Sequence, residues 1–313
     1  MRIAILDDYQ HVALGFADWA SLDAEITVFH EPFADEDAVV KGLAGYDVAV
    51  AMRERTPFPA HVLRRLTGLR LLVTTGTGNR SIDIEAAREL GVTVACTGYM
   101  SAPTAELTWA LILSAVRNVP AENRSVRAGG WQTGVGGDLH GRTLGLLGLG
   151  RLGTRVAEIG RAFGMETVAW SQNLTAERAA EQGVTAVAKD ELFACADVLS
   201  VHLVLSERTR GLVGAAELAA MKPTALLVNT SRGPIVDEFA LLTALREHRI
   251  GGAALDVFDQ EPLSAHHPLR RLDNALLTPH VGYVTRDTYE VFYRDAVEDI
   301  AAWAAGSPVR VLT

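Results

Sequence analysis

The sequence predicts an α/β protein of two domains, each built on an open sheet of parallel strands. Short apolar runs of strand length alternate with amphipathic helical patterns along the chain. The length of 313 residues suits two domains that each bury a core. Near the middle, a glycine-rich turn at residues 148–153 joins a strand run to a helical pattern, as is common in sheets of this kind.

Composition and charge argue against several kinds of partner. The net charge is −9 and no basic stripe is present, which disfavours nucleic acid and anionic membranes. No uncharged apolar run reaches the ~18 residues of a membrane span. Met1-Arg2 leads directly into a strand run, which leaves no room for a signal peptide. Cys96 and Cys195 lie far apart without metal-ligand spacing, so we expect a soluble, cytoplasmic protein with reduced thiols and no metal site.

Residues 1–99 are expected to form the first domain. Its strand runs are rich in β-branched residues and are bounded by Gly, Pro, Asp or Asn, with helical patterns between them. The expected strands are Ile3–Leu6, Ile26–Phe29, Val48–Ala51, Leu69–Thr74 and Val92–Ala95, and the expected helices are Glu36–Leu43, Pro59–Leu66 and Ile84–Leu90. A glycine-bearing turn, Thr74–Asn79, follows the fourth of these strands.

The next segment, Ser101–Val119, predicts a long helix that bridges the two domains. Pro103 suits its first turn, and Glu106 places negative charge near its N-terminus. A polar, glycine-rich arm follows at Ala121–Gly141, with Trp131 in its middle. An arm of this length either covers a partner or neighbouring subunit or packs as a loop on its own domain, and both interpretations stay open.

The second domain opens with the glycine motif. A strand run, Thr143–Leu147, precedes it, and a helical pattern and a second strand run, Thr167–Trp170, follow it. Gly148 would permit the tight turn, Gly150 would let backbone N–H groups approach a pyrophosphate, and Gly153 would let helix and strand pack closely. The stretch resembles a Rossmann dinucleotide-binding unit; a glycine-rich turn without a ligand is the alternative.

The remaining strands of this domain are expected at Val184–Val187, Val198–His202, Ala225–Asn229, Gly252–Leu255 and Ala275–Thr278. A helix is expected over Asp237–Arg246, with Asp237 as its N-cap. Another long helix, Thr285–Ala305, ends the chain, and Pro308–Leu312 would return to the first domain. The second domain is therefore expected to be inserted into the first, with a cleft between them.

Three residues with catalytic potential follow the last three strands of the second domain. Since ligands bind outside the carboxyl ends of such strands, Arg232, Glu261 and His280 are expected at one edge of the sheet. A guanidinium binds a carboxylate bidentately and polarises a carbonyl, and a histidine exchanges a proton with a carbonyl or alcohol oxygen. A carboxylate beside the ring favours the imidazolium and fixes its orientation. Taken singly, Arg232 paired with Asp237, a solvated Glu261 and a backbone-bonded His280 are the alternatives.

Four motifs in this order resemble those of the D-isomer-specific 2-hydroxyacid dehydrogenases, and the likeness covers essentially the whole chain. They are GLGRLG at 148–153, NTSRG at 229–233, Asp256–Phe258 with Glu261-Pro262, and TPHVG at 278–282. The resemblance implies two doubly wound parallel-sheet domains and usually a homodimer. A flavodoxin-like substrate domain would comprise 1–99 and 285–313, and a Rossmann cofactor domain, 100–284, would be inserted into it.

The resemblance also implies hydride transfer between a nicotinamide and C2 of a 2-oxo or 2-hydroxy acid. Arg232 would bind substrate, His280 would be the acid/base and Glu261 its partner, while Asp256 would face the nicotinamide carboxamide. Arg53, Thr77 and Gly78 would bind substrate with Arg232. The implied cofactor contacts are Gly148, Gly150, Arg151, Leu152, Gly153, Ser171, Val204, Thr209, Thr230 and Asp256.

Departures from the family pattern leave parts of this picture open. The strand ending at Trp170 is followed by Ser171 rather than the acid that often holds a ribose hydroxyl, so NAD is only slightly favoured over NADP. Arg80 replaces a frequent acid, and Val204 replaces a frequent proline. Glu261 is kept where the similar formate dehydrogenases have glutamine, which favours ordinary carbonyl chemistry.

The sequence thus predicts an NAD(P)-dependent 2-hydroxyacid dehydrogenase that works as a 2-oxo acid reductase, on a substrate such as glyoxylate or hydroxypyruvate. The alternative is a dinucleotide-sensing, corepressor-like binding protein of the same fold. The intact set of Arg232, Glu261 and His280 and the lack of an appended recruitment tail count against that alternative.

Overall fold

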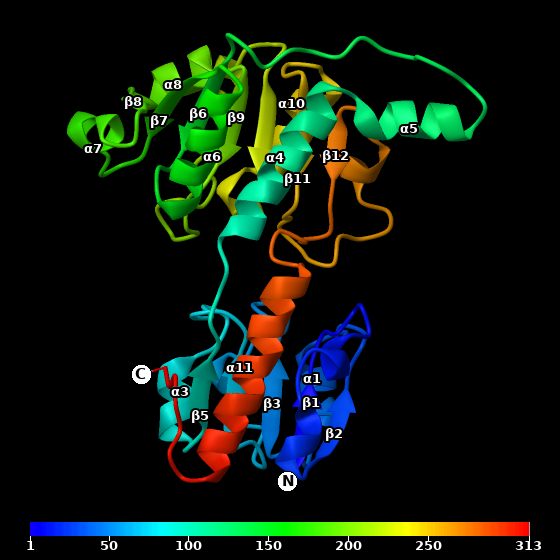
Figure 1. Ribbon diagram of the computed structural model, residues 1–313, viewed down its shortest axis with the longest axis vertical. Helices are drawn as coiled ribbons and strands as arrows, with labels where there is room; N and C mark the ends of the chain where they lie inside the picture. Colours follow the sequence, from blue (N-terminus) through cyan, green and yellow to red (C-terminus); the bar gives the residue numbers. More distant parts are fainter. Residues whose placement is uncertain (313) are drawn as a thin grey trace. The chain divides into compact units, whose positions relative to one another are not determined.

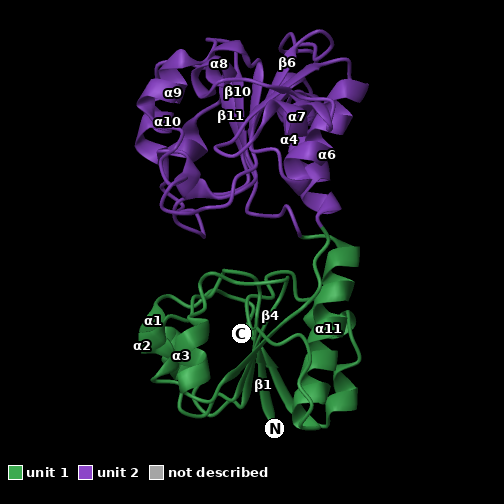
Figure 2. Ribbon diagram, turned by 90° about the vertical axis from the view of Figure 1, so that its left-hand side faces the viewer, with its two compact units in different colours: residues 1–100, 284–313 green, residues 101–283 purple. Residues whose placement is uncertain are grey.

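The computed structural model describes residues 1–312 and separates into two compact units (Figure 2). One unit combines Met1–Met100 with Val284–Thr313, and the other is Ser101–Tyr283. Each point at which the chain passes from one unit to the other lies one residue away from the expected domain boundary. Both units contain a parallel sheet with interleaved helices, so the predicted α/β fold class is confirmed.

The first unit has five parallel strands in the order β2-β1-β3-β4-β5, the flavodoxin-like order. Its strands are β1 (Arg2–Ile5), β2 (Glu25–Val28), β3 (Val48–Ala51), β4 (Leu71–Thr74) and β5 (Thr93–Cys96). Its helices are α1 (Glu36–Gly42), α2 (Ala60–Leu63), α3 (Ile84–Glu89) and α11 (Arg286–Ala304), with 3-10 turns η1 (Ala13–Gly15) and η2 (Trp19–Leu22). Helices α1–α3 cover one face of the sheet and α11 covers the other (Figure 2).

The second unit has seven parallel strands in the order β12-β11-β10-β9-β6-β7-β8. The strands are β6 (Thr143–Leu147), β7 (Glu166–Trp170), β8 (Thr185–Ala186), β9 (Val198–Val201), β10 (Leu226–Asn229), β11 (Gly252–Leu255) and β12 (Ala275–Leu277). The order reverses between β6 and β9, as in a Rossmann sheet, and ligands bind at such a switch point.

Helices cover both faces of this second sheet. They are α4 (Ala102–Val116), α5 (Val119–Arg127), α6 (Arg151–Ala162), α7 (Ala176–Ala180), α8 (Lys189–Cys195), α9 (Ala215–Ala220) and α10 (Glu238–Arg246), with 3-10 turns η3 (Gly233–Ile235) and η4 (Pro268–Arg271). Residues of α8, α9 and α10 pack on one face, and residues of α4 and α6 pack on the other. None of the helices within residues 1–312 is long and apolar enough to cross a membrane.

The segment between α4 and β6 differs from the expectation. The predicted helix over Ser101–Val119 ends at Val116, and the first part of the expected arm forms α5. Asn118 adopts a left-handed backbone, φ 53°, which stops α4, and Pro120 then suits the first turn of a new helix. No residue of α5 is buried, and Figure 1 shows α5 standing out from its unit before a long segment returns to β6.

Candidate active site

The glycine turn lies at the switch point, between β6 and α6. Gly148 has φ +109°, and a Cβ there would lie 2.6 Å from the His202 carbonyl oxygen. A Cβ on Gly153 would overlap the Gly148 carbonyl oxygen. The fold itself therefore requires glycine at both positions, the first for the turn and the second for close packing of the helix.

Gly150 differs from these two glycines. It is the N-cap of α6 with an ordinary extended backbone, φ −90° and ψ −164°, and no atom lies within 4 Å of a Cβ built there. Nothing in the fold demands glycine at this position, and no side chain caps the first N–H groups of the helix. The open space and uncapped helix N-terminus fit the pyrophosphate of a dinucleotide.

The other expected cofactor residues follow the strands β7, β9 and β10 of the same sheet. Ser171 is half-buried directly after β7, and the strand end offers no carboxylate at 171–173. The Val204 side chain is 65% exposed, and the Thr209 hydroxyl donates to its carbonyl oxygen at 2.8 Å. The Thr230 hydroxyl is buried and lies 2.9 Å from that of Thr108 on α4. The Thr230 side chain thus binds its own unit, and its cofactor contact stays a prediction.

The loops after β11 and β12 bring Glu261 and His280 into contact. His280 Nδ1 lies 2.6 Å from Glu261 Oε2, and Glu261 Oε1 accepts the Phe258 N–H at 2.9 Å. Both carboxylate oxygens of this exposed glutamate therefore have hydrogen-bond partners within the protein. The ring of Tyr283 meets the His280 ring edge-on at 5.6 Å. Within residues 1–312, His280 Nε2 has no hydrogen-bond partner, which leaves this atom for a ligand.

Asp256 holds the loop that carries this histidine. Its Oδ1 accepts the Thr278 hydroxyl at 2.6 Å and the Val281 N–H at 2.9 Å, and its Oδ2 accepts the Gly282 N–H at 2.9 Å. Burial raises the pKa of the Asp256 carboxyl, and these hydrogen bonds and the His280 charge oppose that shift. Asp256 therefore fixes residues 278–282, a role the sequence did not reveal, while its contact with the nicotinamide stays a prediction.

Arg232 follows β10 on a loop shaped by buried Asn229. The Asn229 amide donates to the Arg232 carbonyl oxygen at 2.9 Å and accepts the Ser231 N–H at 3.0 Å. The Arg232 guanidinium donates to the Ser231 carbonyl oxygen at 2.7 Å. A Cβ on Gly233 would overlap the backbone of Phe258, so the loops after β10 and β11 touch through their backbones. The structure thus links the Arg232 loop to the segment that binds Glu261.

The expected substrate residues Arg53, Thr77 and Gly78 lie in the first unit, after β3 and β4. Arg53 has φ +53°, its guanidinium donates to the Thr75 carbonyl oxygen at 3.0 Å, and it lies over the ring of Tyr99 at 5.3 Å. In the described part of the chain, the N–H groups of Thr77 and Gly78 have no acceptor. Two adjacent unpaired N–H groups can bind a carboxylate.

Sequence reasoning missed several residues that support these positions. Thr278 belongs to the quoted TPHVG motif, but its place at a strand end gave no sign that it binds Asp256. Asn229 likewise belongs to the quoted NTSRG motif, but its place at a strand end gave no sign that its amide shapes the Arg232 loop. Among residues 1–312, no group of three or more His, Cys, Asp or Glu side chains is arranged to hold a metal ion.

Comparison with known proteins agrees with the family resemblance of the sequence motifs. Residues 109–282 match the family model described as D-isomer specific 2-hydroxyacid dehydrogenase, NAD binding domain. A glyoxylate reductase of Aeropyrum pernix is 44% identical over 255 residues, which cover 78% of this chain and 76% of that protein. A D-3-phosphoglycerate dehydrogenase of Archaeoglobus fulgidus is 34% identical over 313 residues, covering 99% of this chain and 58% of that protein.

The chain therefore spans little more than half the length of that second relative. Among solved structures, a phosphoglycerate oxidoreductase from Vibrio cholerae o395 superposes with a TM-score of 0.93 at 40% identity. The match covers 98% of this chain and 99% of that one.

Proposed function

This chain belongs to the D-isomer specific 2-hydroxyacid dehydrogenase family, and from that premise we propose that it reduces a small 2-oxo acid to the D-2-hydroxy acid. It is an NAD-dependent oxidoreductase that acts on the CH–OH group of a 2-hydroxy acid. The observation that supports the catalytic role is the 2.6 Å contact between His280 Nδ1 and Glu261, which leaves Nε2 available to a substrate oxygen.

In the reductive direction, His280 begins protonated and donates the Nε2 proton to the substrate oxygen. Bound NADH supplies the hydride that is added to C2. Glu261 accepts the Nδ1 proton in a hydrogen bond, which orients the ring and stabilises the imidazolium before transfer. The Arg232 guanidinium binds the substrate and polarises its carbonyl. In oxidation the same histidine begins neutral and accepts the proton.

The substrate carboxylate is bound by the N–H groups of Thr77 and Gly78, with Arg53 beside them. The unpaired state of these two N–H groups and the guanidinium held at Thr75 support this assignment. Glyoxylate and hydroxypyruvate are the substrates we put first; a glyoxylate reductase stands among the relatives. Ser171 at the end of β7 can bond either ribose, and NAD is favoured over NADP.

The protein acts as a cytoplasmic homodimer, with neither nucleic acid nor membrane as a partner. Apolar side chains of α5 and the segment after it support the dimer: Val119 is 51% exposed, Val126 55%, Trp131 73% and Val135 97%. A second copy of the chain would remove this surface from water. The net charge of −9 supports the lack of nucleic-acid and membrane partners.

The test is a screen of the purified protein with glyoxylate, hydroxypyruvate and pyruvate, each with NADH and with NADPH. The absorbance of the reduced nicotinamide measures the reaction. Oxidation of either cofactor together with formation of the D-hydroxy acid is the expected result. Tight cofactor binding without turnover of any of the acids would instead favour a dinucleotide-sensing protein.

A further inference from the structure

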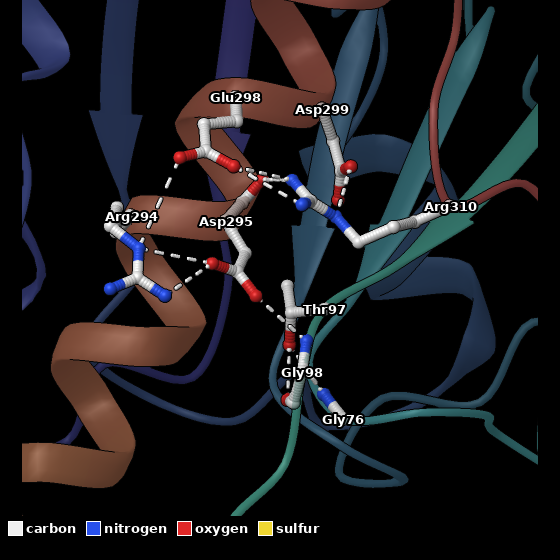
Figure 3. Close-up of polar contacts among 8 residues, drawn as sticks. All are labelled: Gly76, Thr97, Gly98, Arg294, Asp295, Glu298, Asp299 and Arg310. Atoms are coloured by element: carbon white, nitrogen blue, oxygen red, sulfur yellow. Dashed lines mark hydrogen bonds and ion pairs between the residues drawn. The ribbon is translucent and has the colours of Figure 1, made fainter.

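A buried carboxylate on α11 contacts the backbone near the end of Met1–Met100, the N-terminal segment of the first unit (Figure 3). Asp295 Oδ2 accepts the Gly98 N–H at 2.8 Å, and the two residues are 197 positions apart in the chain. Asp295 is only 6% exposed. Its other oxygen, Oδ1, accepts from the Arg294 guanidinium at 2.9 Å, so the carboxylate is charge-paired while it holds the backbone.

The same contact reaches the substrate turn through Thr97. The Thr97 hydroxyl donates to the Gly98 carbonyl oxygen at 3.0 Å and accepts the Gly76 N–H at 2.7 Å. Thr97 is 1% exposed and Gly76 is buried, so water does not replace these bonds. Asp295, Gly98, Thr97 and Gly76 thus form one continuous line of hydrogen bonds within the first unit, visible in Figure 3.

Gly76 directly precedes the two N–H groups assigned to the substrate carboxylate. Its backbone is left-handed, φ +83°, and a Cβ there would overlap the Arg53 guanidinium. Since the Gly76 N–H is held by Thr97, the direction of the following peptide groups depends on that bond. Thr77 and Gly78 have no partner of their own to hold them in the described residues.

A second set of contacts holds α11 at this point. Arg310 Nη2 donates to the Asp295 carbonyl oxygen at 2.8 Å, and Arg310 Nε donates to Asp299 at 2.9 Å. Leu312 N donates to the Val94 carbonyl oxygen at 2.8 Å, which attaches the same C-terminal segment to β5. The helix, β5 and the substrate turn are therefore fixed to one another around Asp295.

We propose that Asp295 and Thr97 are positioning residues for substrate binding, which hold the Gly76 turn so that the Thr77 and Gly78 N–H groups face the substrate carboxylate. The inference rests on the proposed function for its substrate, but the contacts themselves do not. It goes further by assigning substrate affinity to a carboxylate on α11 and to a hydroxyl that do not touch the substrate.

The main variant is Thr97→Val, which keeps the side-chain shape and leaves the Gly76 N–H without an acceptor. Because leaving a buried donor without an acceptor changes an equilibrium by about 5- to 150-fold, we expect KM for glyoxylate or hydroxypyruvate to rise about 10-fold. The kcat should stay within about 2-fold, since His280 is untouched. Thr97→Ser, which keeps the hydroxyl, should restore KM, and NADH affinity should be unchanged in both variants.

Asp295→Leu should raise KM in the same way, and Asp295→Asn, which keeps an acceptor oxygen for Gly98, should stay near the wild-type value. Glu290→Gln is the matched control: it neutralises an exposed carboxylate on the same helix that pairs with Arg286 and has no contact with Asp295, its partners or Gly98. Its KM should equal that of the wild type.

Amide hydrogen exchange of Gly76 gives a readout independent of turnover. The amide should be protected in the wild type and in Thr97→Ser, and should exchange faster in Thr97→Val and Asp295→Leu. If the wild type reduces no 2-oxo acid, the proposed function fails while this measurement still tests the positioning. Unchanged Gly76 protection in Thr97→Val overturns the proposal, as does a lower melting temperature with unchanged KM, the result of a purely structural role.

Discussion

Gly150→Ala should separate cofactor binding from folding. The backbone at Gly150 is one that alanine adopts freely, and its Cβ would have no neighbour within 4 Å. Lower entropy of the unfolded chain would stabilise the variant by about 0.4–1 kcal/mol. Alanine is a poorer N-cap than glycine, which removes about 0.5–1 kcal/mol. The two effects nearly cancel, so the melting temperature should change by no more than about 2 °C.

The NADH affinity of the same variant should fall sharply. The added methyl group occupies the space through which a pyrophosphate would approach the N–H groups at the start of α6. Losing one charge-assisted hydrogen bond there removes about 1.5–3 kcal/mol, which corresponds to a Kd about 10- to 150-fold higher. Fluorescence titration with NADH and thermal unfolding of the same preparation measure both quantities.

Two further glycine variants complete this experiment. Gly153→Ala should destabilise the fold, because its Cβ would overlap the Gly148 carbonyl oxygen. Gly15→Ala, in η1, is the matched control: it has equally open space around its Cβ but lies outside the glycine motif, so NADH affinity should not change. The reasoning is refuted if Gly150→Ala binds NADH within 2-fold of the wild type, or if it unfolds more than about 5 °C lower.

The remaining predictions concern the acid/base, substrate and buried histidine groups. His280→Ala should lower kcat by about 10²- to 10⁴-fold, and Arg232→Ala should lower kcat and also raise KM; steady-state kinetics that match the wild type would remove either residue from the mechanism. The pH optimum should be lower for reduction than for oxidation, since His280 must begin protonated in one direction and neutral in the other; coincident optima would contradict its role. Burial lowers the pKa of His202 to about 4, below the ~6.5 of an unfolded chain. The folded state therefore binds fewer protons, and the free energy of unfolding should fall by up to about 3 kcal/mol as the pH drops from 6.5 to 4. Measured by urea unfolding over the same pH range, the free energy of unfolding should fall less for His202→Gln than for the wild type. An equal fall in both proteins would contradict this assignment.

Much of the fold follows from local sequence patterns. The strand β3 at Val48–Ala51 and the helix α10 with its Asp237 cap lie where the patterns predict them. Short apolar runs and helical spacing are patterns over a few neighbouring residues. They predict strands and helices well because these elements form over the same short range of sequence. The predicted helix over Ser101–Val119 was too long at its C-terminal end for a local reason. The left-handed backbone at Asn118, which ends α4, has no strong signal in the sequence.

The glycine motif shows where sequence and structure divide. The spacing of Gly148, Gly150 and Gly153 predicts a dinucleotide-binding turn. It does not indicate which of the three glycines the fold itself requires. The surroundings of each Cβ separate two glycines that the fold requires from one that it does not. That distinction depends on atoms of His202 and of the turn itself, which lie together only after β6 and β9 pair.

By itself, the sequence determined the two parallel-sheet units, the order of the motifs and the residue types available for chemistry, because each depends on local spacing. The tertiary structure alone decided that Glu261 reaches His280, that Asp256 holds the histidine loop and that Asp295 meets Gly98. These contacts depend on strand order and on the packing of α11 against its sheet. Such long-range geometry has no periodic signature along the chain.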